Sequence, residues 1–207
     1  MSNSVVEDYL KAVYAHTEWQ PQPITSGALA ARLGLAASTV TEMVKKLVAQ
    51  GLVRHEPYGA IELTDAGRAL ALRMVRRHRL IETWLVEHVG YTWDEVHDEA
   101  EVLEHAMSDR LLDALDAQLG HPARDPHGDP IPAADGSISR PDAVLLASVE
   151  GGTVVRISDR DPLLLRHLEA SGVRLDANVT RTPRGLRVGA AEIEVSEEAL
   201  RSIWVRA

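Results

Sequence analysis

The chain has 207 residues, of which 45% are hydrophobic, so it is long enough for one to about three domains with a real core. It contains no cysteine, which excludes disulfides, zinc–thiolate sites and thiol nucleophiles. The N-terminal stretch MSNSVVEDYLK carries acids where a signal peptide has its apolar run, and no apolar segment approaches the roughly 18 residues that a membrane span requires. These features predict a soluble, cytoplasmic protein. The net charge is −9, and residues 73–140 hold most of it, with 7 basic against 14 acidic side chains.

The first third of the chain has the pattern of a winged helix-turn-helix. Residues 4–17 have a helical period of apolar positions, and Thr25 can cap a short helix that Gly34 ends. A second helix is expected from about Ala37 to Gln50, with Val40, Met43, Val44 and Leu47 facing inward. Two short β-type runs around Pro57-Tyr58-Gly59 then predict a hairpin, the wing.

The second of these helices presents small hydroxyl and charged side chains outward, which suits contacts to phosphates and base edges in a major groove. The candidate DNA-binding residues are Ser26, Ser38, Thr39, Thr41, Glu42, Lys45 and Lys46. The weak overall basicity counts against DNA binding, and three-helix units of this kind also serve as protein-interaction modules. Both interpretations stay open on the winged helix alone.

The middle of the chain holds the side chains that could bind metal. A long helix is expected from Thr64-Asp65 to about His88, with His78 and Glu82 one turn apart, and a further long helix over Trp93–Leu119. In the latter, HDEAEVLEH (His97–His105) places His97, Glu101, Glu104 and His105 within an arc of about 100°. Such side chains can converge on one or two metal ions. The alternative is an acidic amphipathic helix with two incidental histidines.

The remaining segments complete the domain organisation. The repeat Leu103, Met107, Leu111, Leu115 and Leu119 predicts either a helix–helix dimer seam or packing within the chain. Residues 120–141 are rich in proline and predict a non-helical connection. From Val144 the pattern alternates between apolar and polar residues, which predicts a small β-barrel-like domain with one helix. The expected fold is mainly α with small β: domains 1–72, 73–141 and 142–207.

The order of these features, with H-x-x-x-E, then VHDEAEVLEHAMSD, then DPHGDPIP, resembles the diphtheria-toxin-repressor family of metal-dependent transcriptional repressors over the whole chain. Within that family it is most similar to the manganese-responsive MntR branch of actinobacteria. The resemblance implies a third domain of SH3-like fold. It implies a primary metal site of Asp8, Glu101, Glu104 and His105, and an ancillary site of His78, Glu82 and His97.

The departures from the family pattern bear on the metal. The iron sensors of the family carry sulfur residues at the positions of Asp8 and Glu101, where this chain has carboxylates, the manganese pattern. Oxygen and imidazole ligands also suit Mn²⁺ or Fe²⁺ on chemical grounds. The third-domain ligands of the iron regulators align with Arg156, which cannot bind a cation, and Asp159, a weak candidate together with nearby Asp161. Lys11 replaces a further acid of two-domain manganese regulators, which argues against a binuclear site of that type.

The resemblance therefore implies a homodimeric, Mn²⁺-dependent repressor that binds double-stranded operator DNA and controls manganese homeostasis, with about two ions per subunit. It implies neither catalysis nor a small organic substrate, and Zn²⁺ or Co²⁺ would substitute in vitro. An Fe²⁺-responsive repressor of the same family is the alternative, and a winged-helix regulator that senses an organic ligand is a weaker one. A di-metal enzyme would need paired Glu-x-x-His motifs on four helices, which the sequence lacks.

Overall fold

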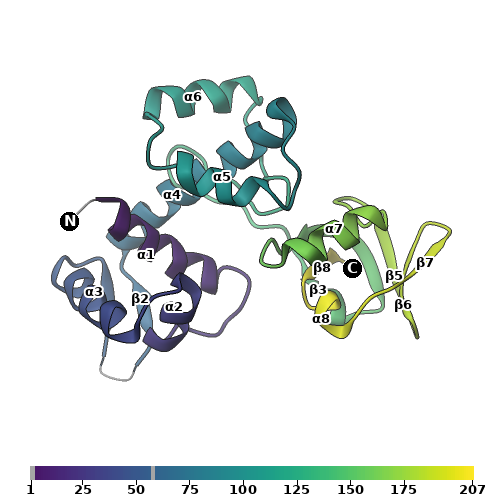
Figure 1. Ribbon diagram of the computed structural model, residues 1–207, viewed down its shortest axis with the longest axis horizontal. Coiled ribbons are helices and arrows are strands. Elements are labelled where there is room, and N and C mark those ends of the chain that lie inside the picture. The colour runs from purple at the N-terminus through teal and green to yellow at the C-terminus, as the bar shows by residue number, and fades with distance from the viewer. Residues whose placement is uncertain (1–2, 57–58) are drawn as a thin grey trace. The chain divides into compact units, whose positions relative to one another are not determined.

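The computed structural model describes residues 3–56 and 59–207, and Figure 1 shows the order of their helices and strands. The chain divides into two compact units. The first unit comprises the chain up to Arg77 together with Pro132–Ser137, and the second comprises His78–Ile131 and Ile138–Ala207. Helix α4 (Asp65–Trp84) contributes its first part to the first unit and its last turns to the second. Among the described residues, none of the helices combines the length and the apolarity needed to cross a membrane.

The first unit is the winged helix that the sequence predicts. Its helices are α1 (Asn3–Thr17), α2 (Ser26–Leu33) and α3 (Ala37–Ala49). Thr25 Oγ1 accepts a hydrogen bond from Ala28 N at 3.2 Å, and Gly34 ends α2 with a φ of 64°, so both predicted caps are confirmed. Strands β1 (Val53–His55) and β2 (Ile61–Leu63) pair antiparallel as the wing, whose predicted turn at 57–58 lies outside the described residues.

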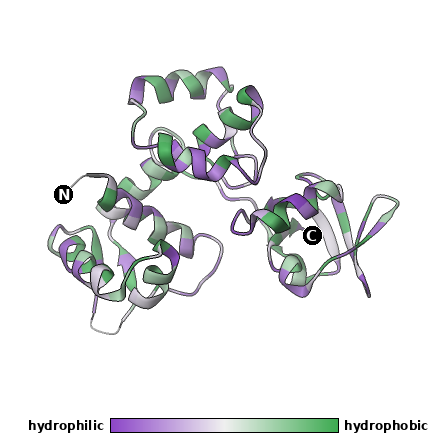
Figure 2. Cartoon of the chain, in the orientation of Figure 1, coloured by the Kyte–Doolittle hydropathy of each residue, from purple (hydrophilic) through white to green (hydrophobic). Residues whose placement is uncertain are grey.

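Apolar faces of these elements meet in the core of the first unit. The alternation of hydrophobic and hydrophilic residues along its helices is visible in Figure 2. The inward-facing residues predicted on α3 are all buried. The most deeply buried side chains of the unit include Leu10, Val13, Tyr14, Ile24, Leu29, Val40, Val44, Leu47, Ile61 and Ala71. The core therefore fixes α3 by one face and leaves its other face exposed.

The helical part of the second unit differs from the prediction in one important respect. Helix α4 continues into a π-helical turn, η1 (Leu85–Val89), and Gly90 ends it as expected. The predicted long helix over Trp93–Leu119 is wrong, because α5 (Val96–Leu103) stops and α6 (Asp109–Gln118) begins anew. Ser108 caps α6 by accepting a hydrogen bond from Leu111 N, and residues 104–107 form a turn between the two helices.

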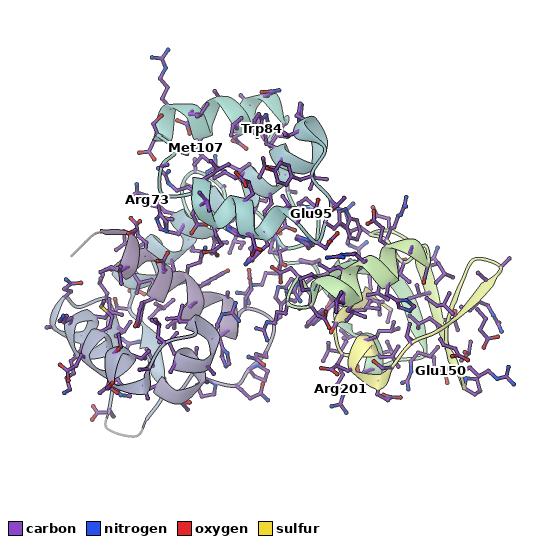
Figure 3. The ribbon with its side chains drawn as sticks, viewed as in Figure 1. Arg73, Trp84, Glu95, Met107, Glu150 and Arg201 are labelled. Atoms are coloured by element: carbon purple, nitrogen blue, oxygen red, sulfur yellow. The ribbon has the colours of Figure 1, made fainter. Side chains whose placement is uncertain are left out.

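Small apolar clusters hold these helices together. Ile81, Leu85, Val96 and Ala100 form one cluster, against which Trp84 and Met107 pack, both of which are labelled in Figure 3. Leu80 packs with Leu112 and Ile131 in another cluster. Met107 and Leu119 pack against this second cluster, so part of the predicted repeat packs within the chain. Leu111 on α6 is 48% exposed and Val102 on α5 is 69% exposed, which leaves apolar surface for the predicted dimer seam.

The connection 120–141 is non-helical, as predicted, but several of its polar residues are buried. After it, six antiparallel strands form one sheet in the order β3-β8-β4-β5-β6-β7. They are β3 (Val144–Leu145), β4 (Gly151–Ile157), β5 (Asn178–Thr182), β6 (Gly185–Val188), β7 (Ala191–Glu194) and β8 (Ile203–Arg206). The helices η2 (Leu146–Ser148), α7 (Pro162–Ala170) and α8 (Glu197–Leu200) accompany the sheet. Their shared core includes Leu146, Val154, Ile157, Leu165, Leu168 and Ile203.

Candidate metal centre and nucleic-acid interface

Helix α3 carries most of the predicted DNA-binding side chains on one exposed surface. Ser38, Thr39, Thr41, Glu42, Lys45 and Lys46 are all exposed, while Ser26 is half-buried at the start of α2. Lys45 Nζ donates to Glu42 Oε1 at 2.7 Å, which lowers the pKa of Glu42. Thr41 Oγ1 donates back to Ala37 O within the helix. The surface is thus polar and of mixed charge, and it suits a groove-binding helix.

The three predicted ancillary ligands lie together in the second unit. His78 and Glu82 are one helical turn apart on α4, and His78 Nε2 is 2.9 Å from Glu82 Oε1. His97 on α5 approaches both, with its Nδ1 3.1 Å from His78 Nε2 and 3.3 Å from Glu82 Oε1. Burial raises the pKa of Glu82, but the contacts with His78 and His97 outweigh it and hold that pKa well below its ordinary range.

Glu104 is positioned by the end of α5 and not by the regular helix that the sequence suggests. It caps the helix and is fully buried, and its Oε2 lies 2.7 Å from His78 Nδ1. Its other oxygen lies 3.5 Å from His105 Nε2. His78 therefore contacts a carboxylate through each of its ring nitrogens, one belonging to each predicted metal site.

Glu101 lies on α5, with its Oε1 3.7 Å from His97 Nε2. Ligand atoms of His78, His97 and Glu101 approach one another within 4.8 Å, a spacing that one ion could bridge. Asp8, the remaining predicted primary ligand, is a half-buried residue of α1 in the first unit. Its participation in a site with Glu101, Glu104 and His105 stays a sequence-based prediction.

The two weak candidates of the third domain have different roles. Asp159 Oδ2 is 3.4 Å from His97 Nδ1, and Glu82, His97 and Asp159 form a second group of possible ligands. Burial raises the pKa of Asp159, but the charges of His127 and His97 outweigh burial, so the pKa lies below its ordinary value. Asp161 instead caps α7, where its Oδ1 accepts hydrogen bonds from the backbone nitrogens of Leu163 and Leu164.

The structure adds two buried residues that the sequence analysis did not assign as ligands. Asp125 and His127 belong to the DPHGDP segment (Asp125–Pro130), and their ligand atoms lie within 4.8 Å of each other and of a Glu82 oxygen. Burial, Asp129 and Glu82 raise the pKa of Asp125 to about 8. Burial lowers the pKa of His127, but Glu82 and Asp125 outweigh it and raise that pKa to about 9. The sequence signal that could have identified these two residues is the placement of ligand-type side chains at alternate positions of a proline- and glycine-rich segment.

The donor chemistry of these groups fits a divalent cation. Glu82 takes part in two groups of three possible ligands, one with His97 and Asp159 and one with Asp125 and His127. We call these five residues the Glu82 cluster. Every donor is a carboxylate oxygen or an imidazole nitrogen, the set preferred by ions such as Mn²⁺ and Fe²⁺. A winged helix in the same chain as such donors defines a metal-responsive DNA-binding protein.

Comparison with known proteins identifies the family. A model of the iron-dependent repressor N-terminal DNA-binding domain matches residues 1–61, and a model of the iron-dependent repressor metal-binding and dimerisation domain matches residues 64–133. The chain is 33% identical over 189 residues to the iron-dependent repressor IdeR of Mycobacterium leprae, covering 84% of this chain and 82% of that protein. Alignments with other IdeR proteins span about half of their length, 54%. The chain therefore belongs to the iron-dependent repressor family, which includes the diphtheria toxin repressors.

Solved structures agree with this assignment. A manganese-dependent transcriptional repressor in complex with manganese is 47% identical, with a TM-score of 0.92 over 97% of this chain and 98% of the other. ScaR with bound Zn²⁺ is 34% identical, with a TM-score of 0.81 over 97% and 98% of the two chains. The protein is a metal-dependent transcriptional repressor and not an enzyme. Its DNA-binding and dimerisation domains indicate DNA and a second copy of the chain as partners.

Proposed function

We propose that the protein is a Mn²⁺-dependent repressor of manganese homeostasis genes, for which the metal is the corepressor. The observation that carries the proposal is the donor set: the possible ligand groups of the second unit are built from carboxylates and imidazoles, and the chain has no cysteine that could supply a thiolate. Thiolate or thioether ligands would favour softer ions. The similarity to a manganese-dependent repressor that was solved with manganese supports the same ion.

We assign the ligands to two sites. The first would use Glu101, Glu104 and His105 with Asp8, as the family resemblance implies. The second would be the Glu82 cluster, which keeps Glu82 and His97 of the predicted ancillary set and adds Asp125, His127 and Asp159. His78 lies 2.9 Å from Glu82 of the second site and 2.7 Å from Glu104 of the first site. It therefore connects the two sites.

The residues of the sites would act mainly through charge. Without metal, carboxylates crowd together in a segment that already carries a net charge of −7. A bound divalent ion supplies positive charge that this segment lacks. His78 and His97 then orient carboxylates through their ring nitrogens, and the outward face of α3 contacts the DNA. Because coupling between ion and operator is reciprocal, operator DNA should also tighten ion binding, by about 5- to 150-fold per site.

A DNA-binding titration tests the identity of the metal. The protein would be stripped with a chelator and titrated on a promoter fragment with Mn²⁺, Fe²⁺, Co²⁺ or Zn²⁺ under anaerobic conditions. We expect Mn²⁺ to activate binding at concentrations that the cell maintains. Activation by Fe²⁺ at lower free concentrations than Mn²⁺ would favour the iron-responsive alternative. Tight binding of Zn²⁺ alone would not contradict the proposal, because intrinsic affinity rises toward the later metals.

Substitution of the proposed first-site ligands tests the site itself. Asp8→Ala and Glu101→Ala should each abolish metal-stimulated DNA binding and leave the fold intact. Asp98→Ala is the matched control, because Asp98 is an exposed acid on the same helix as Glu101. If either ligand variant responds to Mn²⁺ at the wild-type midpoint, its assignment to the site is wrong.

A further inference from the structure

Arg156 occupies an unusual position for an arginine. It lies on β4 in the sheet domain, is only 7% exposed, and donates from Nε to Asp129 Oδ1 at 2.8 Å. Its guanidinium group lies over the ring of Trp204 on β8, 4.3 Å from the ring centre. The register between β4 and β8 shifts between Val154 and Arg156, and such a bulge redirects the side chain that follows it.

The partner of Arg156 belongs to the DPHGDP segment, which carries two members of the Glu82 cluster. Asp129 and Asp125 bind each other's backbone: Asp129 N donates to Asp125 Oδ1 at 2.9 Å, and Asp125 N donates to Asp129 O at 3.0 Å. Asp125 Oδ1 also accepts from His127 N at 2.9 Å. Displacement of Asp129 would therefore move both Asp125 and His127.

The same segment rests directly on the backbone of β4. Ile157 N donates to His127 O at 2.9 Å. A Cβ atom added to Gly128 would lie 2.1 Å from Val155 O and 2.9 Å from Arg156 Cα, so the two backbones are in close contact. The backbones of the DPHGDP segment and β4 are thus already in contact. The hydrogen bond from Arg156 to Asp129 adds a charged interaction between the same two segments.

Charge explains why a fixed cation is useful here. The Glu82 cluster and Asp129 bring four buried or half-buried carboxylates together: Glu82, Asp125, Asp129 and Asp159. Arg79 on α4 also contacts this group, with Nε 3.5 Å from Asp125 Oδ2 and Nη2 3.5 Å from Asp129 Oδ1. An arginine keeps its charge at every relevant pH, so these two side chains offset the carboxylates whether or not an ion is bound.

We propose that Arg156 is a positioning residue for the second metal site: through Asp129 it holds the DPHGDP segment against β4 before any ion binds. The family resemblance aligns Arg156 with a third-domain metal ligand of the iron regulators. In this chain the same position would supply a permanent positive charge and no metal ligand. This inference rests on the proposed function for the second site. The contact of Arg156 with Asp129 does not require a metal ion. Its effect on the DPHGDP segment can therefore be tested separately from metal binding.

Trypsin provides the metal-free test, because the Arg124–Asp125 bond lies at the start of the DPHGDP segment. Chelated full-length protein would be digested and cleavage at this bond followed by mass spectrometry. We expect Arg156→Met to accelerate the cleavage roughly 10-fold or more, the scale expected for loss of a hydrogen bond between charged groups, and Arg156→Lys to accelerate it less. Arg160→Met is the matched control, because Arg160 is an exposed arginine of the same part of the chain. Cleavage of the Arg156→Met protein at the wild-type rate would overturn the proposal.

Direct binding of Mn²⁺, counted by electron paramagnetic resonance of the free ion, tests the effect on the site. In Arg156→Met we expect one ion to bind as in the wild type and the other to bind about 10- to 100-fold more weakly, the range typical for loss of a residue that orients ligands. Asp129→Asn should have a similar effect, and the double variant should be no worse than the more affected single one. If the binding of both ions were weakened equally, the assignment of Arg156 to the second site would be overturned. If the wild type binds no Mn²⁺, the proposed function fails, while the cleavage rates still decide the role of Arg156.

Discussion

The close contact between Gly128 and β4 leads to a quantitative prediction about stability. Gly128 has a φ of 94°, and an added Cβ would lie 2.1 Å from Val155 O and 3.0 Å from Leu175 Cδ2. Gly128→Ala therefore imposes two penalties. An alanine in the positive-φ region costs about 1–2 kcal/mol, and the displacement of packed backbone costs a further 1–3 kcal/mol, on the order of other overpacking substitutions. We expect the free energy of unfolding of the second unit to fall by roughly 2–5 kcal/mol.

Urea unfolding of the chelated protein, followed by tryptophan fluorescence, measures this loss. Three of the four tryptophans, Trp84, Trp93 and Trp204, belong to the second unit. Gly172→Ala is the matched control, because Gly172 lies in the same unit with a φ of 79° but an added Cβ there would meet nothing within 4 Å. It should lose only the backbone penalty, about 1–2 kcal/mol. Equal losses in the two variants would refute the argument that the segment and β4 are in steric contact.

Three further predictions concern other parts of the chain. Thr25→Ala removes the acceptor of Ala28 N and should destabilise the first unit by about 1 kcal/mol, measured by thermal unfolding, whereas Thr25→Ser should not. Desolvation raises the pKa of Asp94, but hydrogen bonds from Thr92 and Arg166 outweigh it, so the pKa lies below its ordinary value of 3.8. The stability contributed by this ionised group is thus complete above pH 3.8 and is lost as the pH falls through the lower folded pKa, so wild type and Asp94→Asn should converge in urea midpoint in acid. Glu101→Cys should broaden activation toward Zn²⁺ or Fe²⁺ in the DNA-binding titration, and an unchanged metal ranking would contradict the selectivity argument.

Local patterns determined much of the fold from the sequence alone. Thr25 and Gly34 bound α2, and Val40, Met43, Val44 and Leu47 face inward on α3, because caps and the helical period are properties of a few neighbouring residues. The pairing of His78 with Glu82 follows from the same period. The break between α5 and α6 was a failure of the same reasoning, since the apolar repeat continues across it while Ser108 starts a new helix.

Contacts between distant segments were decided only by the tertiary structure. Nothing in the local sequence places Asp125 and His127 beside Glu82, because more than 40 residues separate them and burial of the DPHGDP segment depends on β4 beneath it. Likewise, Arg156 could be excluded as a ligand from its chemistry, but its partner Asp129 and its stacking on Trp204 emerge only from the sheet register and its bulge. Residue types thus determine which ions the chain can bind, whereas long-range packing of apolar and charged groups determines which donors meet.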